Sequence, residues 1–106
     1  MPLTEDGSIA AVGDYAGQAA KAMDNLHTAL AAAGATLEDV VKTTVLVAST
    51  ERRDLFTAWQ VVRDAFGEHD APITLMGVTV LGYRDQLVEI EAVAAVLNSD
   101  DLLTSN

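Results

Sequence analysis

The sequence predicts an α+β domain in which two helices cover one face of a mixed β-sheet. Three observations lead to this fold class. Two stretches carry apolar residues at helical spacing, two alternate with the period of a strand while a third is rich in β-branched residues, and their order is helix, strand, helix, strand, strand. A strand–helix–strand unit makes a right-handed crossover between parallel strands, and the last strand then adds an antiparallel neighbour. The prediction is therefore a two-layer domain with a mixed sheet.

The first helix is predicted over residues 14–33. Asp14 suits the N-cap position, and Gly34 suits the left-handed position that follows a helix. Between them the apolar residues recur at helical spacing: Ala16, Ala19, Ala20, Met23, Leu26, Leu30 and Ala33. Polar side chains, among them Gln18, lie mostly off this stripe, so the helix should cover a neighbour with one side only. Residues 1–13 are expected to be a lead-in with at most a short extended piece at 8–12.

The first strand is predicted over Val40–Ala48, after a tight polar turn at residues 36–39. Alternation places one set of side chains on one face and a second set on the other. The first set is Val41, Thr43, Val45 and Val47, and the second is Val40, Lys42, Thr44 and Leu46. The second face is neither fully polar nor fully apolar, so we expect it to be only partly exposed.

The second helix is predicted to follow Ser49 or Thr50, either of which can serve as its N-cap, and to end at Gly67. Its apolar stripe consists of Leu55, Phe56, Trp59, Val62 and Phe66. Helical spacing predicts that these side chains form the part of the core that the helix contributes.

The stretch Ile73–Val96 is predicted to be an antiparallel hairpin, because two β-branched runs flank a polar break at residues 82–85. Gly77 inside the first run indicates a bulge or a close backbone approach. In the second run one face is purely apolar, whereas the other carries Glu89 and Glu91 among aliphatic side chains. Carboxylates in such a setting are costly unless they are paired or used, so they are the first candidates for a chemical site.

Composition limits the function classes. The 106 residues suit a single domain, 1–106, in which the tail at 97–106 is frayed or weakly docked. Sixteen acidic residues against six basic ones give a net charge of −10, which repels phosphate backbones, so nucleic acid is not expected as a partner. The absence of cysteine excludes disulfides and thiolate chemistry. Acidic residues near Met1 do not fit a signal peptide, no apolar run suits a membrane, and a cytoplasmic location is expected.

Self-association is expected from the sheet itself. Two helices can cover one face of three strands, while the other face presents Leu46, Leu87 and Val93. Monomers rarely leave an apolar patch of this kind in water. The simplest remedy is a second copy of the chain on the uncovered face.

Three segments together resemble the Rid family, also called YjgF or endoribonuclease L-PSP, in its RidA-like form. They are NLHTALAAAGATLEDVVKTTVLVAS (25–49), AFGEH followed by AP (65–69 and 71–72), and LVEIEAVA (87–94). The resemblance covers roughly residues 2–96. It implies a chorismate-mutase-like subunit that assembles as a homotrimer with small-molecule clefts between subunits. Family members usually begin with a hairpin ahead of the segment that matches Met1. Either the true start lies upstream of Met1, or the sheet has an unpaired edge that something else must cover.

The resemblance implies an activity, the hydrolysis of enamines and imines such as 2-aminoacrylate to a 2-keto acid and ammonia. In the family an arginine after the AP-like turn binds the substrate carboxylate, and the first glutamate of the VEIEA motif positions or activates water. That glutamate corresponds to Glu89. The alignment places Ile73 where the arginine is expected, and an isoleucine cannot bind a carboxylate, which weakens the case for deamination.

The resulting candidates are Glu89 as the catalytic residue and Ile73, Thr74, Tyr83 and Arg84 as substrate-binding residues. The alternative for Glu89 is a structural carboxylate bonded to Lys42 or Thr44. Glu91 fits a structural role better, and Arg84 and Tyr83 also fit ordinary surface positions. His27 and His69 lack further ligands at metal-binding spacing, so neither a metal nor another cofactor is expected.

Three functions remain open. One is a deaminase-related trimer with a ligand cleft, and another is a non-catalytic metabolite-binding or regulatory trimer. Ribonuclease activity, which one family name suggests, is disfavoured by the charge of −10.

Overall fold

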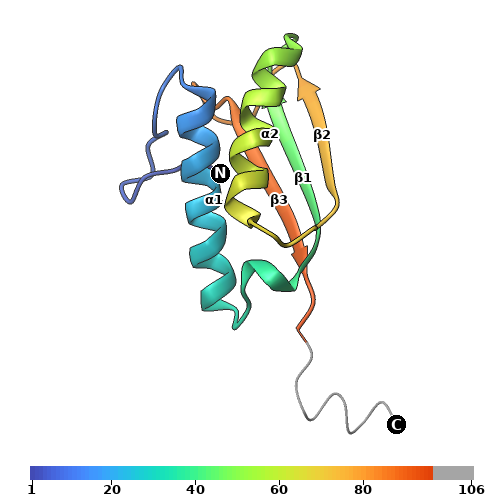
Figure 1. Cartoon of the computed structure of the whole chain (residues 1–106). Helices are drawn as coiled ribbons and strands as arrows, with labels where there is room; N and C mark the ends of the chain where they lie inside the picture. The colour runs from blue at the N-terminus through green and yellow to red at the C-terminus, as the bar shows by residue number, and fades with distance from the viewer. Residues whose placement is uncertain (97–106) are drawn as a thin grey trace, which may run out of the picture.

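The computed structural model describes residues 1–96. The elements are α1 (Tyr15–Ala32), a 3-10 helix (Leu37–Asp39), β1 (Val40–Ala48), α2 (Arg52–Phe66), β2 (Ile73–Val78) and β3 (Val88–Ala94). The two helices lie on the same face of the sheet, where α1 packs over β3 and α2 packs over β1 and β2 (Figure 1). The predicted α+β, two-layer class is confirmed. The tail at residues 97–106 lies outside the described residues.

The strand order is β2-β1-β3, so the prediction of a hairpin over Ile73–Val96 is wrong. Both strands exist, but β1 lies between them (Figure 1). β1 pairs in parallel with β2, as the crossover rule predicts, and antiparallel with β3. Residues 79–87 carry the chain from β2 across the end of β1. Alternation identifies a strand but not its partner, and a connection of this length does not force the two strands it joins to pair.

A β-bulge exchanges the two faces at the start of β1. The register with β3 shifts between Val40, which lies opposite Ala94, and Lys42, which lies opposite Val93. As a result Val40 is buried (1% exposed) and Val41 is exposed (52%), the reverse of the prediction. Beyond the bulge the alternation is as predicted, with Thr43, Val45 and Val47 fully buried toward the helices.

The buried face of α2 is rotated from the predicted stripe. Ala58, Val62 and Phe66 are buried, whereas Phe56 is 52% exposed and stacks beside the half-buried Trp59. The predicted stripe was built from large apolar side chains and left out Ala58. The structure buries this small residue, which lets the helix approach the sheet closely. Gly67 follows the helix with a φ of 64°, as predicted.

The turn into α2 also differs from the prediction, since neither Ser49 nor Thr50 is the N-cap. Glu51 occupies that position without a capping side chain. The Ser49 hydroxyl instead accepts from the Glu51 amide at 2.9 Å and donates to Asp54 at 2.7 Å. Ser49 therefore stabilises the turn through its side chain, as a residue two positions before the N-cap and not as the N-cap itself.

The ends of α1 agree with the prediction. The Asp14 carboxylate accepts from the Gly17 amide at 3.0 Å, and Gly34 adopts a φ of 78°. Ahead of the helix, an isolated bridge joins Leu3 to Ile9, and of these two only Ile9 lies in the predicted extended piece at 8–12. In the loop between these two residues, hydrogen bonds from the Ser8 and Thr4 hydroxyls and the Ser8 amide lower the pKa of Asp6 to about 2.

Candidate functional site

The helices leave one face of the sheet uncovered, and we call it the open face. It consists of Lys42, Thr44, Leu46, Thr74, Met76, Glu89, Glu91 and Val93. Several of its apolar side chains meet water in the single chain: Met76 is 46% exposed and Val93 is 56% exposed. The predicted combination of carboxylates and aliphatic side chains on one face is therefore present.

Glu89 lies in a row with Leu46 and Met76 across the three strands. Leu46 on the central strand is its direct neighbour in this row, Met76 lies on the far side of Leu46, and the Glu89 side chain is half-buried. Thr44 lies opposite Glu91 and Lys42 lies opposite Val93, so neither of the partners considered in the structural alternative is directly across from Glu89. Within residues 1–96 its carboxylate takes part in no ion pair or hydrogen bond. The carboxylate is thus free to act on a ligand or on water.

Thr74 shares a row with Thr44 and Glu91 on the same open face. Two strand spacings separate Thr74 from Glu91, about 10 Å across the sheet. Thr74 therefore lies on the Glu89 side of the sheet but one row away from it.

Ile73 points to the opposite face. It pairs with the fully buried Thr43, and its side chain packs against the core under α2. There it lines a pocket of about 270 Å³ that we call the helix-side pocket. The lining residues are Trp59, Arg63, Phe66, His69, Asp70, Ala71, Pro72 and Ile73.

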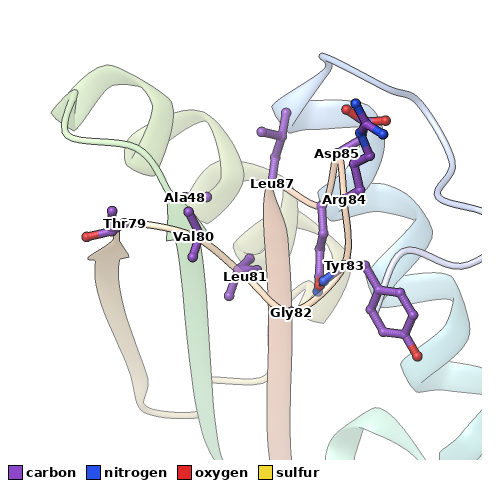
Figure 2. Close-up of a pocket in the computed structure, with 10 residues that line it drawn as sticks. Ala48, Thr79, Val80, Leu81, Gly82, Tyr83, Arg84, Asp85 and Leu87 are labelled. Atoms are coloured by element: carbon purple, nitrogen blue, oxygen red, sulfur yellow. The ribbon is translucent and has the colours of Figure 1, made fainter.

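Tyr83 and Arg84 lie in a third place, the loop of residues 79–87 (Figure 2). This loop and Ala48 enclose a pocket of about 380 Å³ at the end of the sheet where β2 finishes. Tyr83 is 49% exposed, and Figure 2 shows its ring projecting outward from the loop, away from β1 and β2. Arg84 is also exposed. Within one chain the predicted site residues are therefore not brought together.

Sequence reasoning missed the residue that holds this loop. Gln18 was placed among the polar, outward positions of the first helix, yet it is fully buried. Its Nε2 donates to the Asp85 carbonyl at 2.8 Å, and its Oε1 accepts from the Leu87 amide at 2.7 Å. The available signal was its place next to Ala19 and one turn before Ala22, both of which belong to the core. Tyr15 is likewise engaged, because its hydroxyl donates to the Ala48 carbonyl.

Residues 1–96 contain neither a metal-binding cluster nor a membrane-spanning helix. No group of three or more His, Asp or Glu side chains there is arranged to hold a metal ion. In the same range, neither helix is sufficiently long and apolar to cross a membrane.

Comparison with known proteins identifies the family. The family model described as endoribonuclease L-PSP matches residues 1–96, which is the whole described range. The chain belongs to this family. No match was found among curated protein sequences.

Solved structures of the endoribonuclease L-PSP family have the same fold. The YjgF gene product of E. coli is 33% identical over 88% of this chain and 72% of its own, with a TM-score of 0.74. E. coli TdcF, solved with bound serine, is 30% identical over 91% of this chain and 75% of its own, with a TM-score of 0.77. A Mycobacterium tuberculosis member of the YjgF/YER057c/UK114 family is 38% identical over 78% of this chain and 69% of its own, with a TM-score of 0.72.

For an endoribonuclease L-PSP family member, the placement of Ile73 and Glu89 has a direct consequence. These are the positions to which the sequence resemblance assigns carboxylate binding and water activation. In one chain they lie on opposite faces of the same sheet. A single small ligand can therefore contact both positions only if they come from two different subunits.

Proposed function

We propose that this protein is an oligomeric Rid-family hydrolase that converts small enamines or imines to the keto acid and ammonia in clefts between subunits. The observation that carries the proposal is Glu89, a half-buried carboxylate beside Leu46 on the open face with no partner in the described chain. A group of this kind, held close to aliphatic surface, suits proton transfer better than structural pairing.

The chemistry assigned to Glu89 is general-base catalysis. The enamine first tautomerises to the imine, and a water molecule then attacks the imine carbon. Glu89 accepts a proton from this water as the new carbon–oxygen bond forms. Glu89 returns this proton to the nitrogen, and the hydroxyl proton of the intermediate follows as the carbon–nitrogen bond breaks. Ammonia leaves, the carbonyl of the keto acid remains, Glu89 is again a carboxylate, and one water is consumed for each ammonia produced.

Oligomerisation is part of the proposal, and two features of the single chain support it. Met76 and Val93 are exposed on the open face, where an adjoining subunit would exclude water from them. In addition, the open face of one subunit must meet the Ile73 side of another if one ligand is to touch both. The sequence resemblance favours a trimer. The structure of TdcF with bound serine supports a small, amino-acid-like ligand for the family. A cytoplasmic location stays a prediction.

The test generates 2-aminoacrylate enzymatically and compares keto-acid release with and without the protein. We expect the protein to accelerate release, and we expect Glu89→Gln to remove the acceleration. Glu91→Gln is the matched control, because it makes the same change on the same face at an exposed carboxylate. Equal rates with and without the protein would reject the catalytic proposal, and full activity of Glu89→Gln would reject the role of Glu89.

A second candidate is a non-catalytic metabolite-binding trimer. The observation that favours it is the lack of a guanidinium for bidentate carboxylate binding. Among residues 1–96 the open face carries Lys42 but no arginine. A cleft of this composition suits a neutral metabolite. Thermal shifts with neutral metabolites but not with keto acids, in a protein without hydrolase activity, would support this reading.

A further inference from the structure

The helix-side pocket combines an apolar floor with an aromatic wall. Phe66, Pro72 and Ile73 supply aliphatic and aromatic surface, and the ring of Trp59 forms part of the wall. At about 270 Å³ the space suits the body of a small organic molecule. Ile73 also lines this pocket, and it is the residue found where the family resemblance expects an arginine.

Arg63 brings a guanidinium to the same pocket, from α2 instead of β2. Its guanidinium carbon lies over the Trp59 ring, 4.7 Å from the ring centre, which is the geometry of a cation–π contact. Its Nε and Nη2 contact Asp64 at 3.4 and 3.2 Å. Its Nη1 has no partner within the described part of the chain. A contact with the face of an aromatic ring leaves the edge of a guanidinium available for a carboxylate.

The contact with Asp64 does not disqualify Arg63 as an anion-binding group. Both side chains of this pair are largely exposed, at 51% and 70%, and exposed pairs of neighbouring residues contribute little. A ligand carboxylate that sits partly out of water against Trp59 competes on favourable terms.

Two other ionisable residues line the pocket. His69 Nε2 contacts the Val40 carbonyl at 2.8 Å, and because a carbonyl only accepts, this nitrogen carries a proton. The ring is thereby fixed at the pocket wall. Asp70 opposes anion binding through like charge, which favours a ligand with a single carboxylate over a dicarboxylate.

We infer that Arg63 supplies the carboxylate-binding guanidinium that Ile73 lacks, and that the helix-side pocket binds small monocarboxylates with an apolar body. This inference rests on the proposed function only in taking the pocket as the half of the cleft that holds the substrate carboxylate. It assigns a specificity role to a residue on α2, where the family resemblance assigns none.

The experiment measures binding to the full-length protein with phenylacetate and with its neutral counterpart, phenylacetamide. Trp59 is the single tryptophan of the chain and lines the pocket, so its fluorescence reports occupancy directly. Calorimetric titration serves as a second readout, since changing Arg63 also alters the surroundings of the indole. We expect saturable binding of phenylacetate and at least about tenfold weaker binding of the amide.

Arg63→Gln should weaken phenylacetate binding at least about tenfold and remove the preference for the acid over the amide. Arg53→Gln is the matched control, because Arg53 is exposed on the same helix and lies outside the pocket lining. Its binding should equal that of the unchanged protein. Equal affinity for acid and amide, no saturable binding, or an Arg63→Gln variant that binds as before would overturn the inference.

The outcome is separable from that of the proposed function. Glu89→Gln should keep phenylacetate binding while it loses hydrolysis. Arg63-dependent binding in a protein that shows no hydrolysis would leave the pocket assignment intact and reject only the catalytic proposal. Hydrolysis that depends on Glu89 but not on Arg63 would do the reverse.

Discussion

Oε1 of Gln18 accepts a hydrogen bond from the backbone amide of Leu87 at 2.7 Å, although 69 positions separate the two residues. The other end of the same amide group donates to the Asp85 carbonyl. One buried side chain therefore satisfies two backbone groups of the loop that leads into β3. Leu87 directly precedes β3 and lies two residues before Glu89. The contact with Gln18 therefore helps to fix the start of the strand that carries the candidate catalytic carboxylate.

Replacing Gln18 with leucine should destabilise the protein. The Leu87 amide and the Asp85 carbonyl would lose their partner at a partly buried position, at a cost of about 1–3 kcal/mol. Urea unfolding followed by Trp59 fluorescence measures the change. Gln60→Leu, at an exposed position on α2, is the control and should change stability little. Equal stability of the two variants would show that water replaces the Gln18 contacts without loss.

Gly77 shows a second close approach, one that the sequence does predict. A Cβ atom at this position would lie 2.8 Å from the Ser49 carbonyl oxygen, and the register with β1 continues through Gly77 without a bulge. Of the two alternatives open from the sequence, the close backbone approach is therefore correct.

We expect Gly77→Ala to lower the free energy of unfolding by about 1–3 kcal/mol, because the turn at Ser49 must move to accommodate the methyl group. Chemical denaturation measures this change. Gly82→Ala adds the same methyl group where no atom lies within 4 Å, and it should be close to neutral. A Gly77→Ala variant as stable as Gly82→Ala would mean that the Ser49 turn is free to shift.

The elements of this fold are predictable from sequence because each is specified locally. Asp14 and Gly34 mark the ends of α1, alternation marks β1 and β3, and a run of β-branched residues marks β2. Strand pairing is not local. β3 joins the free edge of β1 instead of pairing with β2, and nothing in the alternation of either strand distinguishes these two outcomes. The bulge at Val41 is not local either, because an extra residue in β1 is defined only by its pairing with β3.

The candidate site divides in a similar way. The place of Glu89 on a partly apolar strand face was predictable, because alternation within its own segment specifies it, whereas its catalytic role stays a prediction. The distribution of Ile73, Thr74, Tyr83 and Arg84 over three separate places was not, because it depends on which face and which end of the sheet each residue occupies. The place of Arg63 beside Ile73 in the helix-side pocket also required the structure, which brings α2 against the start of β2.

Met76→Asp should weaken self-association. Met76 lies on the open face beside Leu46, and a carboxylate there would lose its hydration if a second subunit covers the face. We expect the dissociation constant to rise at least about tenfold, as followed by sedimentation velocity over a concentration series. Val12→Asp is the control, because Val12 is 65% exposed in the segment before α1. An unchanged protein that is already monomeric at micromolar concentration would contradict the proposed intersubunit cleft.

Labelled RNA incubated with the pure protein at low salt should remain intact, despite the name of the family. The charge of −10 opposes approach of a phosphate backbone, and low salt strengthens that repulsion. Gel electrophoresis over a time course is the measurement. Cleavage that is lost in Glu89→Gln would overturn this expectation, whereas cleavage retained in that variant would indicate a contaminating nuclease.

Asp70→Asn should strengthen binding of phenylacetate to the helix-side pocket. Asp70 lines the same pocket as Arg63, so its negative charge opposes a bound carboxylate, and removing it should raise affinity by about two- to fivefold at low salt. Because Asp70 is exposed, added salt should reduce this gain. Glu68→Gln makes a similar charge change two residues away and outside the pocket lining, and it should have a smaller effect. Titration of the Trp59 fluorescence at two salt concentrations measures both variants. A loss of affinity in Asp70→Asn would show that Asp70 acts on the bound acid through a hydrogen bond and not through its charge, and that the anion sits elsewhere than against Arg63.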